Sequence, residues 1–249
     1  MLTNIWNTVL YEPLLNALAF LVSIVPGGNV GLAVIALTIL VKVFLFPLSQ
    51  KSIESQAKMT ILTPEIDKIK KSGASKEEQA KQTFDLYKKH KTNPFSGCLL
   101  VLIQIPIIFA LYYVFYKGIK FDAGMLYFFV PVPEHLNMFF LGVDLAGKSI
   151  ILAVLAGVSQ FFQARLMPKP TVNTANDGSF QASFAKSMQV QMKYVFPFLV
   201  AFIAYSVSGA IALYWIVSNM FAIGQQVYSN YKNKENNNKN VKTISFTEK

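Results

Sequence analysis

The sequence predicts an all-α integral membrane protein with five transmembrane helices, a cytoplasmic antiparallel helical hairpin between the first two, and an interfacial N-terminal helix. The 249 residues are 53% hydrophobic and only 14% charged, about half the charged share of a soluble domain. Mean hydropathy is +0.40, and apolar runs of membrane-spanning length alternate with polar segments. This composition excludes an ordinary soluble globule and, for most of the chain, disorder. The single cysteine, Cys98, excludes an internal disulfide.

Four apolar stretches supply the five predicted spans. Three of the spans lie at residues 30–49, 94–117 and 149–167. Each is long enough to cross a hydrocarbon core of about 30 Å at about 1.5 Å per residue. The fourth stretch, 195–228, is apolar over 34 positions, and as one helix of about 50 Å it is too long for a single crossing. Since Ser208-Gly209 is a natural turn, we predict a tight pair of spans at 188–207 and 209–229.

The N-terminal segment, residues 1–29, leaves two interpretations open. Residues 14–25 give only 12 apolar positions between Pro13 and Pro26, which is short for a span and suits a helix lying in the interface. We expect the interfacial helix and keep an additional span as the alternative. No Lys or Arg precedes the apolar run, so it is not a standard signal peptide.

The distribution of basic residues predicts the orientation. Of the 23 Lys and Arg residues, 19 fall on one side of the five predicted spans, and only three fall in the segments on the other side. By the positive-inside rule, the N-terminus is outside and the C-terminus is cytoplasmic. Topology therefore accounts for most of the net charge of +10, and we expect no specific nucleic-acid binding.

The cytoplasmic hairpin is predicted at residues 50–93. A heptad seam on its first arm comprises Met59, Leu62, Ile66 and Ile69, and the seam on its second arm comprises Ala80, Phe84 and Tyr87. The capping box Ser75–Glu78 starts the second arm, and Thr63-Pro64 predicts a break or kink in the first. A spacer between two spans needs only a few residues. The length and basic surface of the hairpin therefore indicate a docking surface, with a simple connector as the alternative.

The remaining segments connect the spans or follow them. We expect residues 118–148 to rest on the outer leaflet, because Pro131 and Pro133 interrupt an otherwise apolar, aromatic-rich run. Residues 168–187 lack periodicity and are predicted to form a loop. The polar, Asn-rich tail at 230–249 is predicted to be disordered, and either touches anionic lipid or RNA phosphate or is inert.

Lys42 is the only ionisable residue deep in the predicted spans, and the spans contain no Asp or Glu. A charge at this depth costs about 2.5 kcal/mol or more. It either snorkels toward the interface or belongs to a polar face, since Thr38 and Ser49 share its side of the helix. Polar side chains that would join it in a cavity open to the cytoplasm are Gln104, Ser159, Gln160, Gln163, Tyr214, Ser218, Asn219, Gln225 and Gln226.

The sequence shows no chemistry of an enzyme. His90 and His135 fall on opposite sides of the predicted membrane, so we expect no paired-His metal site, and we expect no cofactor. The absence of carboxylates in the spans argues against an ion-coupled transporter. A small channel or transporter with a polar cavity, or a purely structural scaffold, remains as the alternative.

Four stretches closely resemble the YidC/Oxa membrane protein insertase family. They are TILVKVFLFPLSQKSIESQAKMTILTPEI, LYKKHKTNPFSGCLLVLIQIPIIFALYYVF, GVSQFFQARLM and FPFLVAFIAYSVSGAIALYWIVSNMFAIGQQ. In this order and spacing they form a specific pattern over about 215 residues. No lipobox cysteine precedes the chain, so we do not expect a lipoprotein form.

The resemblance implies a function and a site. The family inserts hydrophobic segments into the membrane, alone or beside the Sec translocon, through a hydrophilic groove open to the cytoplasm and to lipid. The basic residue of the groove aligns with Lys42, the Thr one turn earlier with Thr38, and the aromatics of the fifth span with Tyr214 and Trp215. Bacterial members usually carry Arg at the Lys42 position, and Lys keeps the charge without the forked geometry.

The resemblance also implies partners and a location. The expected partners are nascent membrane proteins, the lipid bilayer, a ribosome bound through the hairpin and the basic tail, the Sec translocon and a targeting factor. The expected location is the bacterial cytoplasmic (inner) membrane.

Overall fold

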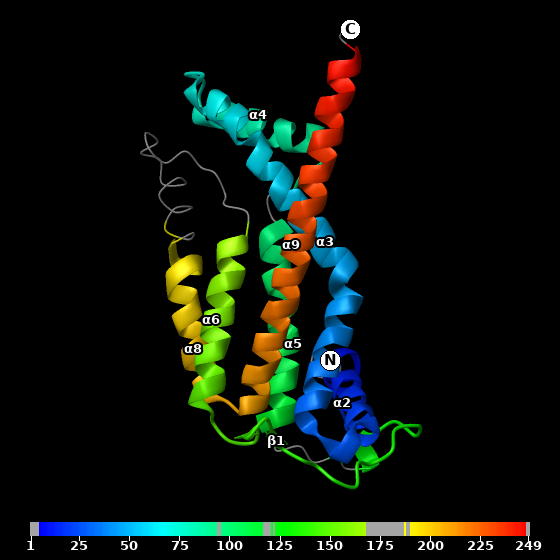
Figure 1. The fold of residues 1–249 in the computed structure, drawn as a ribbon. Helices are drawn as coiled ribbons and strands as arrows, with labels where there is room; N and C mark the ends of the chain where they lie inside the picture. Colours follow the sequence, from blue (N-terminus) through cyan, green and yellow to red (C-terminus); the bar gives the residue numbers. More distant parts are fainter. Residues whose placement is uncertain are drawn as a thin grey trace.

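The fold is a bundle of long helices in a computed structural model that describes residues 5–93, 96–116, 121, 123–167, 187 and 190–247. The longer helices are α2 (Glu12–Ile24), α3 (Val30–Lys71), α4 (Lys76–Lys89), α5 (Ser96–Tyr116), α6 (Ile150–Leu166), α8 (Phe196–Ser206) and α9 (Gly209–Thr247). Short helical turns are η1 (Asn7–Tyr11), η2 (Pro26–Gly28), η3 (Ala123–Met125) and η4 (Gln191–Val195), and one small antiparallel ladder joins β1 (Phe139–Phe140) to β2 (Val143–Asp144). The arrangement is shown in Figure 1.

The helices are apolar enough to form a membrane protein. Three have the length and composition to cross a bilayer, and these are Asn7–Ile24, Val30–Lys71 and Gly209–Lys232. Two shorter apolar helices accompany them, at Leu102–Phe115 and Ile150–Leu166. The predicted helical membrane fold is confirmed at this level, and the two-residue strands are its one departure from an all-α description.

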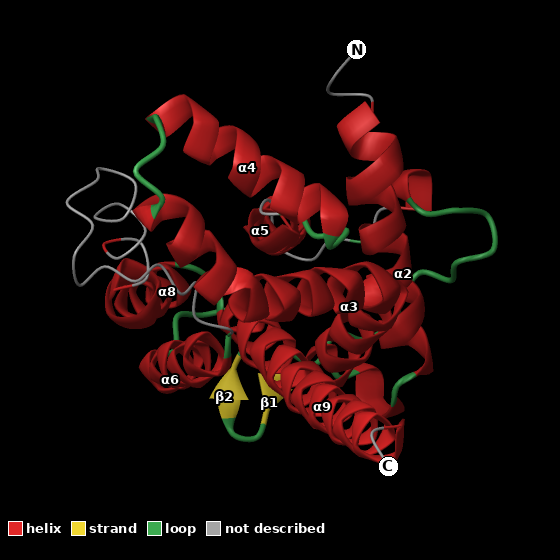
Figure 2. Ribbon diagram, turned by 90° about the horizontal axis from the view of Figure 1, so that it is seen from above, coloured by secondary structure: helices red, strands yellow, loops and turns green. Residues whose placement is uncertain are grey.

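Helix α9 lies at the centre of the bundle. It packs against α3 and α5 on one side and against α6 and α8 on the other, as the view from above in Figure 2 shows. The most deeply buried apolar side chains gather near the end of the bundle where β1 and β2 lie. Leu18, Val30, Leu145, Val200 and Tyr214 are each at most 2% exposed. These residues come from α2, α3, α8, α9 and the loop before α6, so these parts of the chain share one core.

Helix α2 is inclined to the axis of the bundle and packs beside the beginning of α3. Its lone polar core residue, Asn16, is 2% exposed. The Asn16 side chain donates to the Met125 carbonyl at 3.2 Å and accepts from the Tyr127 N–H at 2.6 Å. Asn16 therefore holds the segment after η3 against α2, because a buried amide needs such partners.

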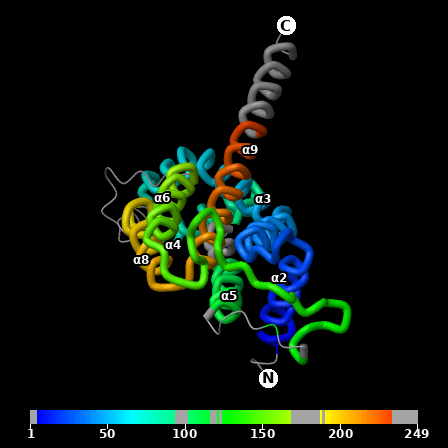
Figure 3. The backbone as a smooth tube through the Cα atoms, turned by 60° about the horizontal axis from the view of Figure 1, so that its bottom comes forward, coloured from blue at the N-terminus to red at the C-terminus, as the bar shows by residue number. Residues whose placement is uncertain are grey.

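The segment predicted to rest on the outer leaflet closes the β-hairpin end of the bundle (Figure 3). Val30 donates its N–H to the Asn137 carbonyl at 2.9 Å, and Asn137 donates to the Gly28 carbonyl at 3.0 Å. Gly28 has a φ of +60°, and a Cβ there would lie 2.2 Å from the His135 carbonyl oxygen, so only glycine fits. Phe128 and Leu141 point outward, at 101% and 88% exposed.

The first span and the first arm of the hairpin form one helix, α3, which runs from Val30 to Lys71 with Pro47 and Pro64 inside it. Of the break or kink predicted at Thr63-Pro64, a break is therefore absent, since the helix continues through Pro64. Helix α4 returns along this arm, and its N-cap Ser75 accepts from the Glu78 N–H at 3.2 Å, as a capping box requires. At the base, the Asn93 N–H donates to the Ser55 hydroxyl at 3.1 Å.

The seam of the second arm differs from the prediction. Phe84 is 56% exposed and Ala80 is also exposed. Tyr87 is partly buried as predicted, but Thr83 and Leu86 accompany it in place of Ala80 and Phe84, and burial raises the pKa of the Tyr87 phenol. The Leu86 side of the helix faces the first arm. Helical periodicity did not predict this, because it does not choose between two adjacent apolar stripes on a mostly polar helix.

The tail also differs from the prediction. Residues 230–249 were expected to be disordered, yet α9 continues as a helix to Thr247. Extending an existing helix adds one hydrogen bond for each residue that is fixed, whereas starting a new helix is costly. The span of α9 therefore supplies the nucleus that this polar sequence lacks. The predicted loop at 168–187 lies outside the described residues, apart from Ser187.

Candidate functional site

Lys42 lies about 18 Å along α3 from Val30, at 1.5 Å per residue. The residues on its side of α3 face protein, since Gly31 and Thr38 are buried and Ile35, Leu45 and Ser49 are partly buried. The apolar residues next to Lys42 face the other way, with Val43 and Phe44 58% and 82% exposed. Lys42 therefore points into the bundle, not along its apolar outer surface.

The ammonium of Lys42 is held by a neutral partner. Lys42 Nζ donates to Gln104 Oε1 of α5 at 3.1 Å. The Gln104 amide in turn donates to the hydroxyl of Tyr214 on α9, whose side chain is 2% exposed. These three residues, here called the Lys42 cluster, connect α3, α5 and α9 in one chain of hydrogen bonds.

No acid neutralises Lys42 among the residues that the structure describes. A lysine paired with a carboxylate is a structural ion pair, whereas one held by an amide keeps its full positive charge. A charge in a low-dielectric setting attracts an opposite charge far more strongly than it does in water. The Lys42 cluster is therefore suited to attract an acidic group that enters the bundle.

Thr38 and Ser218 are buried beside this cluster, and the Ser218 side chain is hydrogen-bonded to that of Tyr214. Thr38 is 1% exposed and donates to the Val34 carbonyl of its own helix at 2.6 Å. Ser218 lies one turn beyond Tyr214 and is 5% exposed, while Trp215 is only partly buried. Of the two predicted aromatics, Tyr214 is closed off inside the bundle and Trp215 is the more accessible.

The other predicted polar residues form a second group, between α6 and α9. Asn219 donates to the Ser159 hydroxyl at 3.0 Å. Gln160, which is 5% exposed, donates to Gln163 at 2.8 Å on the same helix. Most of the predicted site residues therefore hydrogen-bond either around Lys42 or at the contact of α6 with α9, and Asn219 lies about 140° around α9 from Tyr214.

A third polar group joins α3 to α9 nearer the hairpin and includes residues that the sequence reasoning did not place in the site. Ser49 donates to Gln225 Oε1 at 2.9 Å. Gln50 donates to the hydroxyl of Ser229, which is 0% exposed, at 3.3 Å. Gln226 instead donates to Asn230 at 3.0 Å along α9. The sequence signal for this group is the polar run at the end of each span. This run has no periodicity that distinguishes buried residues from surface residues.

Metal binding finds no support in the described part of the chain, where no group of three or more His, Cys, Asp or Glu residues gathers. The polar groups here are amides, hydroxyls and one ammonium. Such groups hydrate or orient a polypeptide and supply neither a metal site nor a nucleophile with an adjacent base.

Comparisons with known proteins agree with this arrangement. A family model described as "60Kd inner membrane protein" matches residues 20–237. A "Membrane protein insertase YidC" of Fusobacterium nucleatum subsp. nucleatum is 33% identical over 223 residues, which are 88% of this chain and 96% of that relative. The chain belongs to the YidC/Oxa family of membrane protein insertases. It is therefore an integral inner-membrane protein.

Other members of the family are longer. A "Membrane protein insertase YidC" of Magnetococcus marinus is 32% identical over 224 residues, which are 90% of this chain but 36% of that relative. The solved structure titled "Active YidC insertase crystal structure with the first transmembrane domain resolved" superposes with a TM-score of 0.54 at 22% identity, covering 88% of this chain and 45% of that one. This YidC/Oxa chain thus shares the fold of that structure and spans about a third of the Magnetococcus relative.

The chain of hydrogen bonds through Gln104 predicts a non-additive loss of stability. Gln104→Leu or Tyr214→Phe alone would each cost about 1–3 kcal/mol of unfolding free energy, because each leaves a buried partner unsatisfied. The double variant would cost at least about 0.5 kcal/mol less than the sum of the two. Unfolding in increasing SDS, followed by fluorescence, measures all three.

Tyr113→Phe on the same helix α5 is the matched control. Tyr113 is 46% exposed, so its hydroxyl should matter by no more than about 0.5 kcal/mol. Strict additivity of Gln104→Leu and Tyr214→Phe would contradict a hydrogen-bonded chain.

Proposed function

We propose that this protein inserts hydrophobic segments of nascent membrane proteins into the bilayer and assists their folding. The observation that carries the proposal is Lys42, which lies deep in the bundle, bonds to the neutral amide of Gln104 and has no acid beside it among the described residues. An unneutralised charge is costly in a membrane and marks a functional site by default. Membership of the insertase family supports the same activity.

The mechanism follows from the polar groups that α9 presents toward α5 and toward α6. The Lys42 cluster and the Ser159–Asn219 group form the walls of a hydrophilic groove that opens to the cytoplasm. A short flank of the nascent chain enters this groove, and Lys42 attracts an acidic residue in it. Gln104, Gln160 and Gln163 hydrate the flank, so polar backbone does not have to enter hydrocarbon unsatisfied.

Lipid partitioning supplies the driving force. Once the flank is held, the apolar segment leaves the groove sideways into lipid, which is favourable by about 25 cal/mol for each Å² of apolar surface removed from water. No nucleotide and no cofactor is needed for this step. The role of Trp215, which is partly buried beside Tyr214, is to contact the segment as it leaves.

Lys42 is proposed to act by its charge. Lys42→Arg should therefore keep insertion activity, whereas Lys42→Met and Lys42→Glu should slow substrates with acidic translocated flanks. We expect a loss of roughly tenfold, equivalent to about 1.4 kcal/mol of attraction. Substrates with neutral, strongly apolar segments should suffer less, since partitioning already drives them. Protease protection of the translocated flank in inverted membrane vesicles measures both substrate types.

Lys148→Met is the control, because Lys148 is exposed at the opposite end of the bundle and its loss should leave both substrates unaffected. An equal loss for acidic and neutral substrates with Lys42→Met would point to a structural role. Full activity of Lys42→Met on acidic flanks would exclude the charge mechanism.

The topology that this mechanism needs is five spans, N-terminus outside and C-terminus in the cytoplasm. The spans are α3, α5, α6, α8 and α9, with α2 lying in the interface. The asymmetric distribution of Lys and Arg supports this orientation. The helical stretch Asn7–Ile24 is long and apolar enough to cross a bilayer, but the inclination of α2 to the bundle axis favours the interfacial position over a sixth span.

Cysteine labelling tests the topology. In a variant without Cys98, a cysteine at Leu141, which is 88% exposed, should react with a membrane-impermeant maleimide in intact cells. A cysteine at Ala80 on α4 should react only after permeabilisation. Labelling of position 80 in intact cells would overturn the orientation.

The hairpin is proposed to dock the ribosome or a targeting factor, with the basic tail as a second contact and the Sec translocon as a lateral partner. Its surface supports this, since α4 has no buried residue and carries Lys88 and Lys89 in its last turn. Basic, solvent-exposed helices bind the phosphates of RNA in a salt-dependent way.

Removal of the hairpin separates docking from spacing. Replacing residues 58–88 by a short Gly-Ser linker keeps the Ser55–Asn93 bond at the base. Insertion and salt-sensitive ribosome cosedimentation should both fall, while the thermal midpoint of the purified bundle stays within about 2 °C, because this hairpin contributes little to the bundle core. Unchanged insertion would leave only the spacer role.

A further inference from the structure

The flank of the bundle away from the Lys42 cluster carries an apolar crevice between α6 and α9, with a volume of about 570 Å³. Its walls include Leu155, Val158 and Phe162 of α6 and Met220 and Ile223 of α9. The side chains at its mouth are open to the surroundings, with Leu155 48%, Phe162 53% and Met220 63% exposed. We call this feature the lateral crevice.

The lateral crevice adjoins the proposed groove at Ser159, which lines both. Met220 and Ile223 follow Tyr214 by six and nine positions, which at about 100° per residue turns them about 120° and 180° away from it around α9. Ser159 lies in the wall of the crevice, and its hydroxyl is engaged by Asn219 and by the Ala156 carbonyl. The crevice therefore offers apolar surface and no free carboxylate or amide for a polar ligand.

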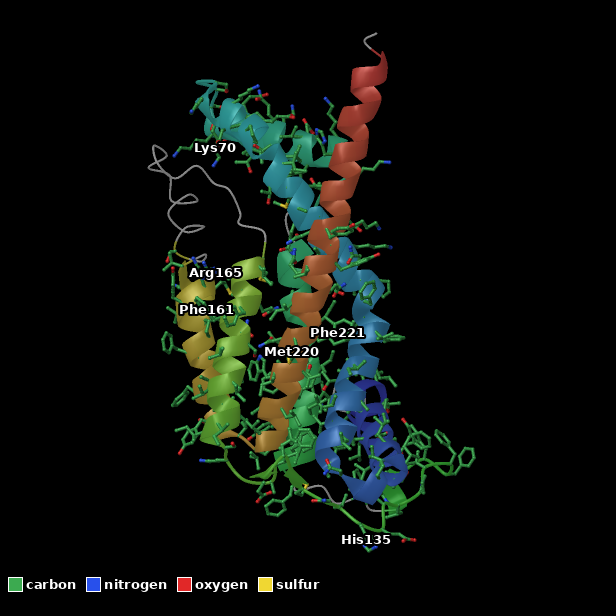
Figure 4. The ribbon with its side chains drawn as sticks, in the orientation of Figure 1. Lys70, His135, Phe161, Arg165, Met220 and Phe221 are labelled. Carbon is green, nitrogen blue, oxygen red and sulfur yellow. The ribbon has the colours of Figure 1, made fainter. Side chains whose placement is uncertain are left out.

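Arg165 stands at one end of the crevice. It is the only arginine in the chain, it lies in the last turn of α6, and its side chain is exposed. Figure 4 shows it at the hairpin end of α6, with Met220 further down the bundle on α9. No ion-pair partner is found for Arg165 among the residues that the structure describes. A guanidinium matches phosphate oxygens with two parallel hydrogen bonds, which an ammonium cannot do.

The length of the crevice fits one leaflet. Arg165 and Leu155 are ten residues apart on α6, which is about 15 Å along the helix. The hydrocarbon core of a bilayer is about 30 Å thick, so half of it is also about 15 Å. With Arg165 at the level of the headgroups, the apolar walls reach as deep as one acyl chain.

We propose that the lateral crevice is a binding site for an anionic phospholipid of the leaflet at the hairpin end. One acyl chain lies along Leu155, Phe162 and Met220, and the phosphate binds the guanidinium of Arg165. Basic residues that flank apolar surface between transmembrane helices are suited to acidic headgroups. Burial of the acyl chain is favourable relative to water, but the surrounding lipid offers the same environment, so the specificity of the site comes from Arg165.

A second copy of the chain is a poorer occupant. Two parallel copies that met through this flank across a two-fold axis would place both Arg165 side chains at the same level of one interface. Like charges facing each other in an interface cost several kcal/mol. A phospholipid phosphate brings the opposite charge to the same place.

The first experiment measures lipid selectivity in the full-length purified protein. Native mass spectrometry counts bound phosphatidylglycerol and phosphatidylcholine of identical acyl chains during titration in detergent. We expect wild type to prefer phosphatidylglycerol by about tenfold at one site, Arg165→Gln to lose that preference, and Arg165→Lys to retain part of it. Met220→Trp, which fills the crevice, should weaken both lipids.

Lys193→Gln is the matched control. Lys193 carries the same charge in η4 at the hairpin end of the neighbouring helix, but its Nζ lies over the Tyr194 ring at 5.0 Å and it does not line the crevice. It should keep the tenfold preference. Equal selectivity of Arg165→Gln and wild type would overturn the proposal.

A second experiment identifies the occupant in cells. A photoreactive benzoylphenylalanine at position 220 should give an adduct with the mass of a phospholipid, whereas one at position 215 faces the proposed groove. An adduct of position 220 with a nascent chain, or with a second copy of the protein, would overturn the lipid assignment. Insertion activity is not the readout, so failure here leaves the role of Lys42 standing, and failure of that role leaves this site standing.

Discussion

A positive charge deep in an apolar bundle is the constraint to which the other helices adjust. Polar groups in hydrocarbon must find partners inside the protein, since no water is there to replace them. Lys42 finds Gln104, and Gln104 finds Tyr214. One hydrogen-bonded chain thereby fixes the relative rotation of α3, α5 and α9. It leaves the positive charge unneutralised, whereas a carboxylate partner would neutralise it.

Helix α9 converts this constraint into two different surfaces. Tyr214 and Gln225 face α3 and α5, and Asn219 faces α6. Met220 and Ile223 line the apolar flank on the far side. Since all of these lie within about three turns of one helix, α9 alone contributes to both the proposed groove and the proposed lipid site.

Structural elements that are determined by neighbouring residues in the chain could be predicted from the sequence. The apolar runs, the depth of Lys42 in its span and the cap at Ser75 each depend on neighbours a few residues away, and the apolar runs are helical and Ser75 caps α4 as those signals predict. Pairings over long distances were not predictable. Asn16 meets Met125 and Tyr127 more than 100 positions later, and helical periodicity shows which side of α2 is buried without naming what covers it.

The differences in α4 and in the tail of α9 each have a physical reason. Phe84 was assigned to the seam of the hairpin because it fits a heptad with Tyr87, but α4 has few apolar residues, so a rotation that buries Leu86 in place of Phe84 costs little. The tail of α9 was assigned to disorder from its composition, which describes an isolated segment. Because the tail is attached to a formed helix, it avoids the free-energy cost of helix nucleation. Amino-acid composition alone does not show that a formed helix precedes the tail.

The continuity of α3 couples the hairpin to the Lys42 cluster. Lys42 and the first arm of the hairpin belong to one helix with Pro47 between them. Proline cannot donate to the carbonyl four residues earlier, so the helix bends most easily there. The bonds from Ser49 to Gln225 and from Gln50 to Ser229 tie α3 to α9 immediately beyond that proline. A force on the hairpin therefore acts on these polar bonds, which can exchange with water. The part of α3 before Pro47 is instead held by the Lys42 cluster and the apolar core. The fold therefore allows the hairpin to tilt while the charge of Lys42 stays in place.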